Sequence, residues 1–237
     1  AVQAAGFSYF TWRESVYGEP SLDTLTSAIA VFWHAGTYYG WAVSPSDAET
    51  LKTYVMRGGS LILEGEDIGY DHDWLGDDFM EKVAHAAFVS DDAIGGGSLN
   101  LIITDPSHPL VQGLASPIVL SSKPPYPDGV TPTAGGYEVV QYEASGLSAI
   151  IVYDGLWGNG SRVVYFAFPL HYLSATDRDT LIQNALKWIL AGDHPDPVLL
   201  GGLLHAANGS LRFNFTVVHD VNLSSAQYSI DGGAWQM

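Results

Sequence analysis

Two carboxylates and a histidine stand where a strand-and-helix fold would place reactive groups. Residues 57–70 read as a helix end at paired glycines, an apolar strand and a glycine-bounded turn over residues 65–69. Such strand-to-helix turns hold a nucleophile above the carboxyl edge of the sheet in α/β proteins. This turn offers Glu66 and Asp67, with no serine at its tip, and the chain contains no cysteine. We therefore expect no catalytic residue, and Asp67 with His171 is the best candidate for a vestigial acid–base pair.

The densest group of acidic residues follows the same strand. Close carboxylates can share a hard cation, so Ca²⁺ is the candidate cofactor, with these ligands: Glu66, Asp67, Asp71 and Asp73. The spacing does not fit an EF-hand loop, because the required glycine and terminal glutamate are out of place. The alternative is a solvated acidic loop, and on that interpretation we expect no cofactor.

Three histidines could meet near the carboxyl edge of the sheet. His34, His72 and His171, together with Asp67 or Asp71, would make a zinc site or an acid–base pair. No His-X-X-X-His or His-Glu pair fixes such a site, so structural histidines are the simpler interpretation.

An aromatic loop could contact a ligand. Tyr38, Tyr39 and Trp41 lie in a glycine-containing segment that is hard to bury, and aromatic rings can stack on sugars. The alternative is that these rings belong to the core, as strand aromatics usually do.

Composition limits the possible partners. The 237-residue chain has 26 acidic residues against 9 lysines and arginines, a net charge of −17. This charge repels nucleic acid and anionic membranes, and no apolar run is long enough for a membrane span. The absence of cysteine excludes disulfides and thiol chemistry. We expect other protein chains as partners.

Four Asn-X-Ser/Thr sequons predict glycosylation and hence an extracellular or cell-surface location. They are at Asn159, Asn208, Asn214 and Asn222. Chance occurrence is the alternative, but three of the four cluster in a lysine-poor, β-like tail.

Strands and helices alternate in the first half of the chain. We expect strands at residues 7–12, 29–33 and 61–63, the second buried on both faces. Helices are predicted from a Ser46–Glu49 capping box to Gly58 and over residues 77–87. This alternation implies βαβ units and a parallel sheet.

The second half reads mostly as strands. Residues 99–103, 137–142 and 149–153 look like strands, and Asn159-Gly160 marks a hairpin between residues 150–154 and 162–168. A last helix near residues 176–192 precedes a proline-rich linker. We expect an α/β domain over residues 1–192, a linker over 193–198 and a partial immunoglobulin-like β segment over 199–237, with strands at 211–217 and 226–230.

Several segments together resemble a known family. The segments that carry this resemblance are residues 33–36, the glycine-ended helix, Gly58-Gly-Ser-Leu-Ile-Leu-Glu-Gly65, and Phe168-Pro-Leu-His171 before the last helix. They are similar to the class I glutamine amidotransferase-like, or flavodoxin-like, fold. More narrowly, they resemble catalytically degenerate accessory domains of large secreted or surface proteins. The resemblance implies a doubly wound, mostly parallel sheet followed by a β-sandwich-like segment. A carboxylate replaces the cysteine that active members carry, which rules out thioester chemistry.

The resemblance also implies one more central strand before Ala1. We expect another polypeptide, an upstream fragment of the same precursor or a neighbouring copy, to supply a strand beside residues 7–12 or 29–33. The function predicted is a non-catalytic structural or interaction module of an extracellular or surface assembly. The alternative is an accessory segment of a secreted peptidase or other hydrolase whose catalytic domain lies outside this chain.

Overall fold

The computed structural model describes residues 1–38, 40–133, 135–155, 160–190, 198–207 and 210–218, the last two as backbone only. By internal contacts the chain divides into two compact units, Ala1–Leu190 and Ala191–Met237. The helices of the first unit are η1 Gln3–Ala5, α1 Glu14–Tyr17, α2 Leu22–Thr26, α3 Pro45–Met56, α4 Ile68–Leu75, the π-helix η2 Met80–Ala84, η3 Pro109–Val111, η4 Leu170–Tyr172 and α5 Ala175–Leu190. Its strands are β1 Val31–Gly36, β2 Leu61–Gly65, β3 Ala86–Ser90, β4 Asn100–Ile103, β5 Ile118–Val119, β6 Gly129–Pro132, β7 Tyr137–Tyr142, β8 Ser148–Asp154 and β9 Arg162–Phe166.

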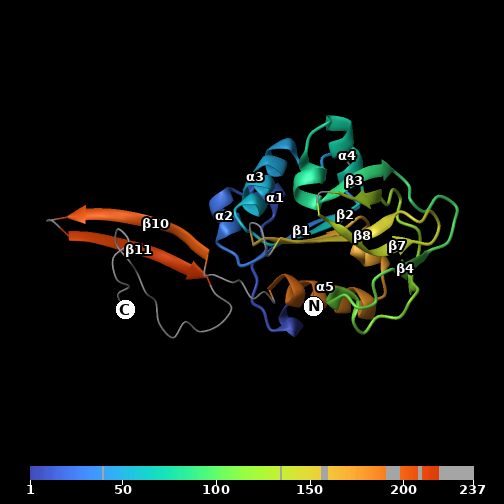
Figure 1. Cartoon of the computed structure of the whole chain (residues 1–237). Coiled ribbons are helices and arrows are strands. Elements are labelled where there is room, and N and C mark those ends of the chain that lie inside the picture. The colour runs from blue at the N-terminus through green and yellow to red at the C-terminus, as the bar shows by residue number, and fades with distance from the viewer. Residues whose placement is uncertain (39, 134, 156–159, 191–197, 208–209, 219–237) are drawn as a thin grey trace. The chain divides into compact units, whose positions relative to one another are not determined.

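One mixed sheet organises the first unit (Figure 1). Its main path runs β1-β2-β9-β8-β7-β4-β5, and β3 and β6 join it through β8. β1 with β2 and β2 with β9 are parallel, whereas every other recorded pairing in this sheet is antiparallel. The expected doubly wound, mostly parallel sheet is therefore wrong. The strand–helix alternation that predicted it stops after β2, and hairpins build the rest.

The β1–α3–β2 segment is the one part that follows the predicted βαβ pattern. Ser44 and Asp47 form the capping box of α3, and Pro45 occupies its first turn, where its missing N–H costs no hydrogen bond. The predicted box at Ser46 and Glu49 was therefore placed two residues too late. The buried face of α3 includes Leu51 and Val55, which pack against the sheet.

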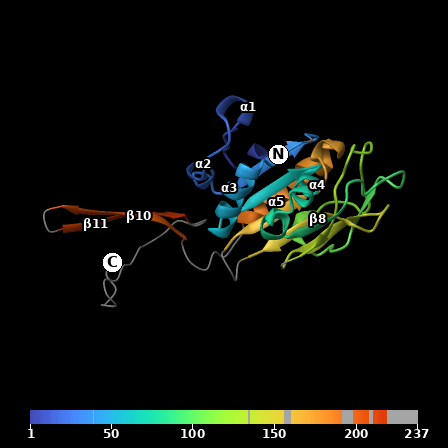
Figure 2. The same ribbon diagram turned by 90° about the horizontal axis from the view of Figure 1, so that it is seen from above.

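The two faces of the sheet carry two separate cores, because successive strand side chains point in opposite directions. In β2, Leu61 and Leu63 pack with α3 and η2, whereas Ile62 packs with α5. Figure 1 shows α3 and α4 above the sheet and α5 below it, and Figure 2 looks onto the sheet from above. The strand predicted at residues 61–63 is present as β2, and all five of its residues are buried.

β1 is an edge strand, which differs from the fully buried strand expected at residues 29–33. Among the described residues it pairs with β2 alone, and all of its side chains are half-buried or exposed. Residues 7–12 form no strand either; most of their side chains lie in solvent. A strand needs a hydrogen-bonding partner, and neither flank of this aromatic segment meets one in the described part of the chain.

Two further differences concern the middle and the tail. The helix expected over residues 77–87 is replaced by η2, and the chain turns at His85, in a left-handed conformation, directly into β3. In the second unit β10 Val198–Ala207 pairs antiparallel with β11 Ser210–Val218, so the predicted strand at residues 211–217 is confirmed. The described part of the tail is a hairpin, and the partial immunoglobulin-like segment stays a prediction, because the predicted strand at 226–230 and most of the linker lie outside the described residues. No helix in the described ranges is long and apolar enough to cross a membrane.

Candidate functional site

The predicted strand-to-helix turn is present at the carboxyl end of β2. Asp67 is the N-cap residue of α4 and adopts a left-handed backbone with φ of 63°. The Glu66 N–H donates to the carbonyl oxygen of Gly36 at 3.0 Å, which ties the turn to the end of β1. A Cβ at Gly65 would lie 2.8 Å from the Ala35 Cβ, so the close approach of the two strands requires glycine.

A buried carboxyl group anchors the first turn of α4. Asp128, fully buried just before β6, accepts hydrogen bonds from the Gly69 N–H at 2.6 Å and the Tyr165 hydroxyl at 3.1 Å. Burial raises the pKa of Asp128 well above 3.8 and also raises the pKa of Tyr165. A Cβ at Gly69 would meet the Asp128 Oδ2 at 3.0 Å, so this contact is built on a glycine.

Asp67 shares its surroundings with a second carboxyl group, Asp91. Burial, followed by the charges of Asp91 and Glu66, raises the pKa of Asp67 to about 7. A side-chain hydrogen bond with Asp91 contributes in the same direction, which requires one of the two groups to hold a proton. Asp67 can therefore take up or release a proton near neutral pH, but it is only 6% exposed.

Glu64, the last side chain of β2 before the turn, joins the interior to the surface. Its Oε1 accepts from the Leu170 N–H at 2.6 Å, and its Oε2 bonds the Nδ1 of His34. Glu64 is completely buried, whereas 61% of the His34 side chain is exposed. The hydrogen bond that the Glu64 carboxylate accepts from the His34 ring raises the pKa of His34.

The proposed calcium ligands are used for other purposes. Asp71 accepts from the backbone N–H groups of Trp41 and Ala42 at 2.8 and 3.2 Å, and Glu66 accepts from that of Tyr126 at 3.1 Å. Asp73 is exposed on α4. Across the described residues no group of three or more histidine, aspartate or glutamate side chains is arranged to hold a metal ion.

The three histidines each have a different neighbour. His34 pairs with Glu64, the Nδ1 of His72 lies 2.8 Å from the Asp77 Oδ2, and His171 is exposed and packs on Tyr172. The recorded side-chain partner of Asp67 is Asp91 rather than His171. The acid–base pair of Asp67 and His171 stays a prediction without a recorded contact.

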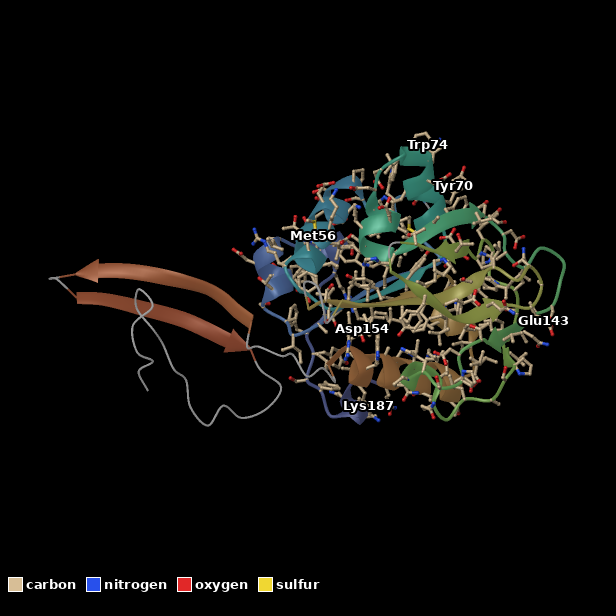
Figure 3. The ribbon with its side chains drawn as sticks, viewed as in Figure 1. Met56, Tyr70, Trp74, Glu143, Asp154 and Lys187 are labelled. Carbon is tan, nitrogen blue, oxygen red and sulfur yellow. The ribbon has the colours of Figure 1, made fainter. Side chains whose placement is uncertain are left out.

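The aromatic loop lies on the surface beside α4. Tyr38 is 62% and Trp41 40% exposed, and Trp41 contacts Trp74 of α4 with ring centroids 5.8 Å apart. In Figure 3 Trp74 and Tyr70 project outward from α4. Trp41 has a φ of 72°, which is rare for a large side chain, and the two hydrogen bonds to Asp71 hold it there. Tyr39 lies outside the described residues.

The glycosylation predictions have no structural test. Asn159, Asn208 and Asn222 lie outside the described residues, and Asn214 lies in β11, where only the backbone is described.

Sequence reasoning missed Asp128, Asp91 and Tyr165. The Pro-Asp-Gly sequence before β6 was read as a loop, and Tyr165 as an apolar strand residue. A charged residue bracketed by proline and glycine was the available signal for Asp128, since such a turn can hold a carboxylate against a neighbouring helix end.

Comparisons with known proteins show only distant similarity. No protein-family model matches the chain, and no curated protein has a significantly similar sequence. A cytoplasmic protein of Salmonella typhimurium, STM3548, is 14% identical, covers 71% of this chain and 74% of its own, and has a TM-score of 0.48. The exo-beta-1,4-mannosidase Op5Man5 from Opitutaceae bacterium strain TAV5 is 12% identical over 72% of this chain and 26% of its own, with a TM-score of 0.45. Similarities this distant assign neither family nor function, and the resemblance to amidotransferase-like accessory domains stays a prediction.

Proposed function

We propose that this chain is a non-catalytic interaction module of an extracellular or cell-surface assembly, which takes up an extended basic segment of another polypeptide along β1. The observation that supports this proposal best is the outer edge of β1. The four sequons support the location.

The outer side of β1 offers backbone groups for pairing. The Val31 N–H donates to the Ser60 carbonyl at 3.0 Å, so Val31 and Trp33 direct their backbone groups toward β2. Backbone groups alternate along a strand, and those of Phe32 and His34 therefore face away from the sheet. Such an edge can accept an added strand.

Large apolar side chains of the N-terminal segment that leads to β1 lie in solvent. η1 packs against α5 and α2 against α3, so the segment between them passes from one face of the sheet to the other (Figure 1). The exposed side chains of this segment and its surroundings are Tyr9, Phe10, Trp12, Val16, Tyr17 and Ile29. Exposed apolar patches of this kind are typical of interaction surfaces.

Charge favours a basic partner over a second copy of this chain. The pKa of Glu14 is raised to about 7 by partial burial and by the charges of Asp47 and Glu19. A lysine or arginine placed there would relieve this repulsion. Two copies, each with a net charge of −17, would instead repel each other.

A set of three model peptides tests the proposal. We expect a short peptide alternating lysine and valine to bind, measured by calorimetry, with NMR shifts at Phe32 and His34. An analogue with glutamate in place of lysine should not bind. A third, N-methylated at alternate amides, should bind about tenfold more weakly, because it cannot donate to the edge.

Variants complete the test. Phe10→Ser combined with Trp12→Ser should weaken binding, whereas Val119→Ser, which removes a 52% exposed side chain on β5, should not. Binding should also be stronger at pH 8 than at pH 6, since Glu14 ionises between them. Equal binding of the N-methylated peptide would show charge attraction without strand addition and would overturn the proposal.

A further inference from the structure

A histidine on the exposed edge strand is held in place by a buried carboxylate. The Nδ1 of His34 in β1 bonds the Glu64 Oε2, and the Glu64 Oε1 accepts from the Leu170 N–H at 2.6 Å. Glu64 is completely buried, whereas 61% of the His34 side chain is exposed. Because both oxygens of Glu64 are engaged, the carboxylate fixes the direction of the imidazole ring and leaves its second nitrogen for other contacts.

That second nitrogen lies at the end of the free edge. Among the described residues, the Nε2 of His34 makes no recorded hydrogen bond. A Cβ at Gly36 would lie 3.6 Å from the ring Cε1 and 3.8 Å from Nε2, so Nε2 lies beside the last residue of β1. Directly opposite residues of paired strands have Cβ atoms about 5 Å apart, so a side chain of an added strand can reach the ring.

The contact with Glu64 decides which chemistry this nitrogen offers. The hydrogen bond to Glu64, followed by its charge, raises the pKa of His34 against the opposing effect of partial burial. In the imidazolium form both ring nitrogens carry a hydrogen, so Nε2 can only donate. A carboxylate gains most from such a donor, because the hydrogen bond is then charged on both sides.

The neighbours of His34 leave the outer side of the ring to a ligand. Glu64 of β2 is the charged group recorded as acting on His34, and the Phe32 ring, 6.1 Å away between centroids, carries no charge. His171 of η4 packs instead on Tyr172, with ring centroids 4.3 Å apart. A carboxylate at Nε2 would therefore place the imidazolium between two acids.

We propose that His34 binds a carboxylate of the partner polypeptide, an aspartate or glutamate side chain that lies opposite it in the added strand. This inference rests on the strand addition proposed above and names one residue of the partner. At other positions the net charge of −17 would repel an acidic side chain. The single carboxylate would therefore fix the register in which the basic segment binds.

A glutamate scan of the lysine–valine peptide tests this inference. One glutamate is moved through the internal positions, and calorimetry compares each peptide with its glutamine counterpart. Glutamate should weaken binding at most positions, because it adds negative charge. At pH 6 we expect one position where glutamate binds about fivefold more tightly than glutamine. At pH 9 this preference should reverse, because the imidazole has lost its proton. Ionisation of Glu14 acts on both peptides of a pair and cancels in the comparison.

Two histidine variants assign the preference to one ring. His34→Gln keeps a polar side chain but cannot become charged, and it should abolish the preference for glutamate at pH 6. His171→Gln removes another exposed imidazole, on η4, and should retain the preference. In NMR titrations of the parent, saturation with the preferred peptide should raise the pKa of His34 further, because a second carboxylate stabilises the imidazolium. The glutamine counterpart should not do so.

The possible failures are distinguishable. If the peptides bind but no position prefers glutamate at pH 6, this inference is overturned while strand addition stands. A preference that survives His34→Gln has the same consequence. If none of the peptides binds, strand addition and this inference are both overturned.

Discussion

β1 and β2 are neighbours in one sheet, yet they make opposite use of their polar groups. All five residues of β2 are buried, and the carboxyl groups of Glu64 within it and Glu66 just after it accept hydrogen bonds from backbone N–H groups. β1 is half-buried, and its outer backbone groups pair with no other strand among the described residues. A buried carboxylate surrounded by its own donors holds the fold together, whereas an edge with unused donors and acceptors can hold a partner.

The hydrogen bond between Glu64 and His34 joins these two regions. Replacing its two side chains should therefore give the largest difference in stability loss. We expect Glu64→Ala to lower the free energy of unfolding by about 3 kcal/mol, because the buried Leu170 N–H loses its acceptor. His34→Ala should cost about 1 kcal/mol or less, because His34 is mostly solvated. Urea denaturation measures both.

Glu143 provides the control for that experiment. It is exposed on the surface (Figure 3) and bonds Asn100 at 3.0 Å. Its replacement by alanine should change stability by less than about 0.5 kcal/mol. Equal losses for Glu64→Ala and Glu143→Ala would contradict the assignment of Glu64 to the buried frame.

Asp67 should make the buried region sensitive to pH. Its pKa rises from 3.8 to about 7 in the folded protein. Between these values the folded state binds more protons than the unfolded state, so this contribution to stability is complete below pH 4 and is lost as the pH rises through 7. Asp67→Asn should therefore match the parent near pH 4 and exceed its stability at pH 8 by about 2 kcal/mol.

The side-chain amide introduced by Asp67→Asn can donate a hydrogen bond to Asp91, as a protonated carboxyl group does. Asparagine also tolerates the left-handed backbone at this position. Asp78 is the control, because its hydrogen bond with Lys52 lowers the pKa and gives the opposite sign. Thermal unfolding across this pH range should show a smaller decline with pH for Asp67→Asn than for the parent. A parallel decline in both proteins would count against the shared proton.

The smallest effect is expected at the edge. Phe10 is 59% exposed, and Phe10→Ser should change the free energy of unfolding by less than about 0.5 kcal/mol. Phe166 is fully buried in β9, and Phe166→Ala should lower the free energy of unfolding by about 4 kcal/mol. A large loss from Phe10→Ser would mean that the aromatic segment belongs to the core and not to an interaction surface.

The sequence was sufficient for elements with strong local signals. β2, β7, α5 and the turn at Asp67 lie where their patterns place them, because a short apolar run between glycines or a wide apolar helix stripe fixes its own structure. The direction of the later strands was not predictable in the same way. A parallel and an antiparallel strand can show the same apolar run, so β4 and β7 gave no warning of the mixed sheet. The Asn159-Gly160 turn signal did predict the antiparallel pairing of β8 with β9, and that prediction is confirmed.

The candidate site was predictable only in part. Asp67 and Trp41 were recognised from glycine-rich turns, but their partners lie far along the chain. Asp91 and Asp128 reach Asp67 and Gly69 only through pairing of the sheet, and no local pattern encodes such a meeting. The strand predicted at residues 7–12 is wrong for the opposite reason, because a segment with strand-forming composition forms no strand without a neighbouring strand to pair with.

The position of β9 has a consequence for how the protein is made. β9 separates the parallel half of the sheet from the antiparallel half, yet it follows β2 by roughly a hundred residues. While the chain emerges from the ribosome, β2 therefore waits with one side uncovered until residue 166 has been synthesised. During that interval the nascent chain exposes a strand of Leu-Ile-Leu sequence, and we expect molecular chaperones to matter most at that stage of its biogenesis.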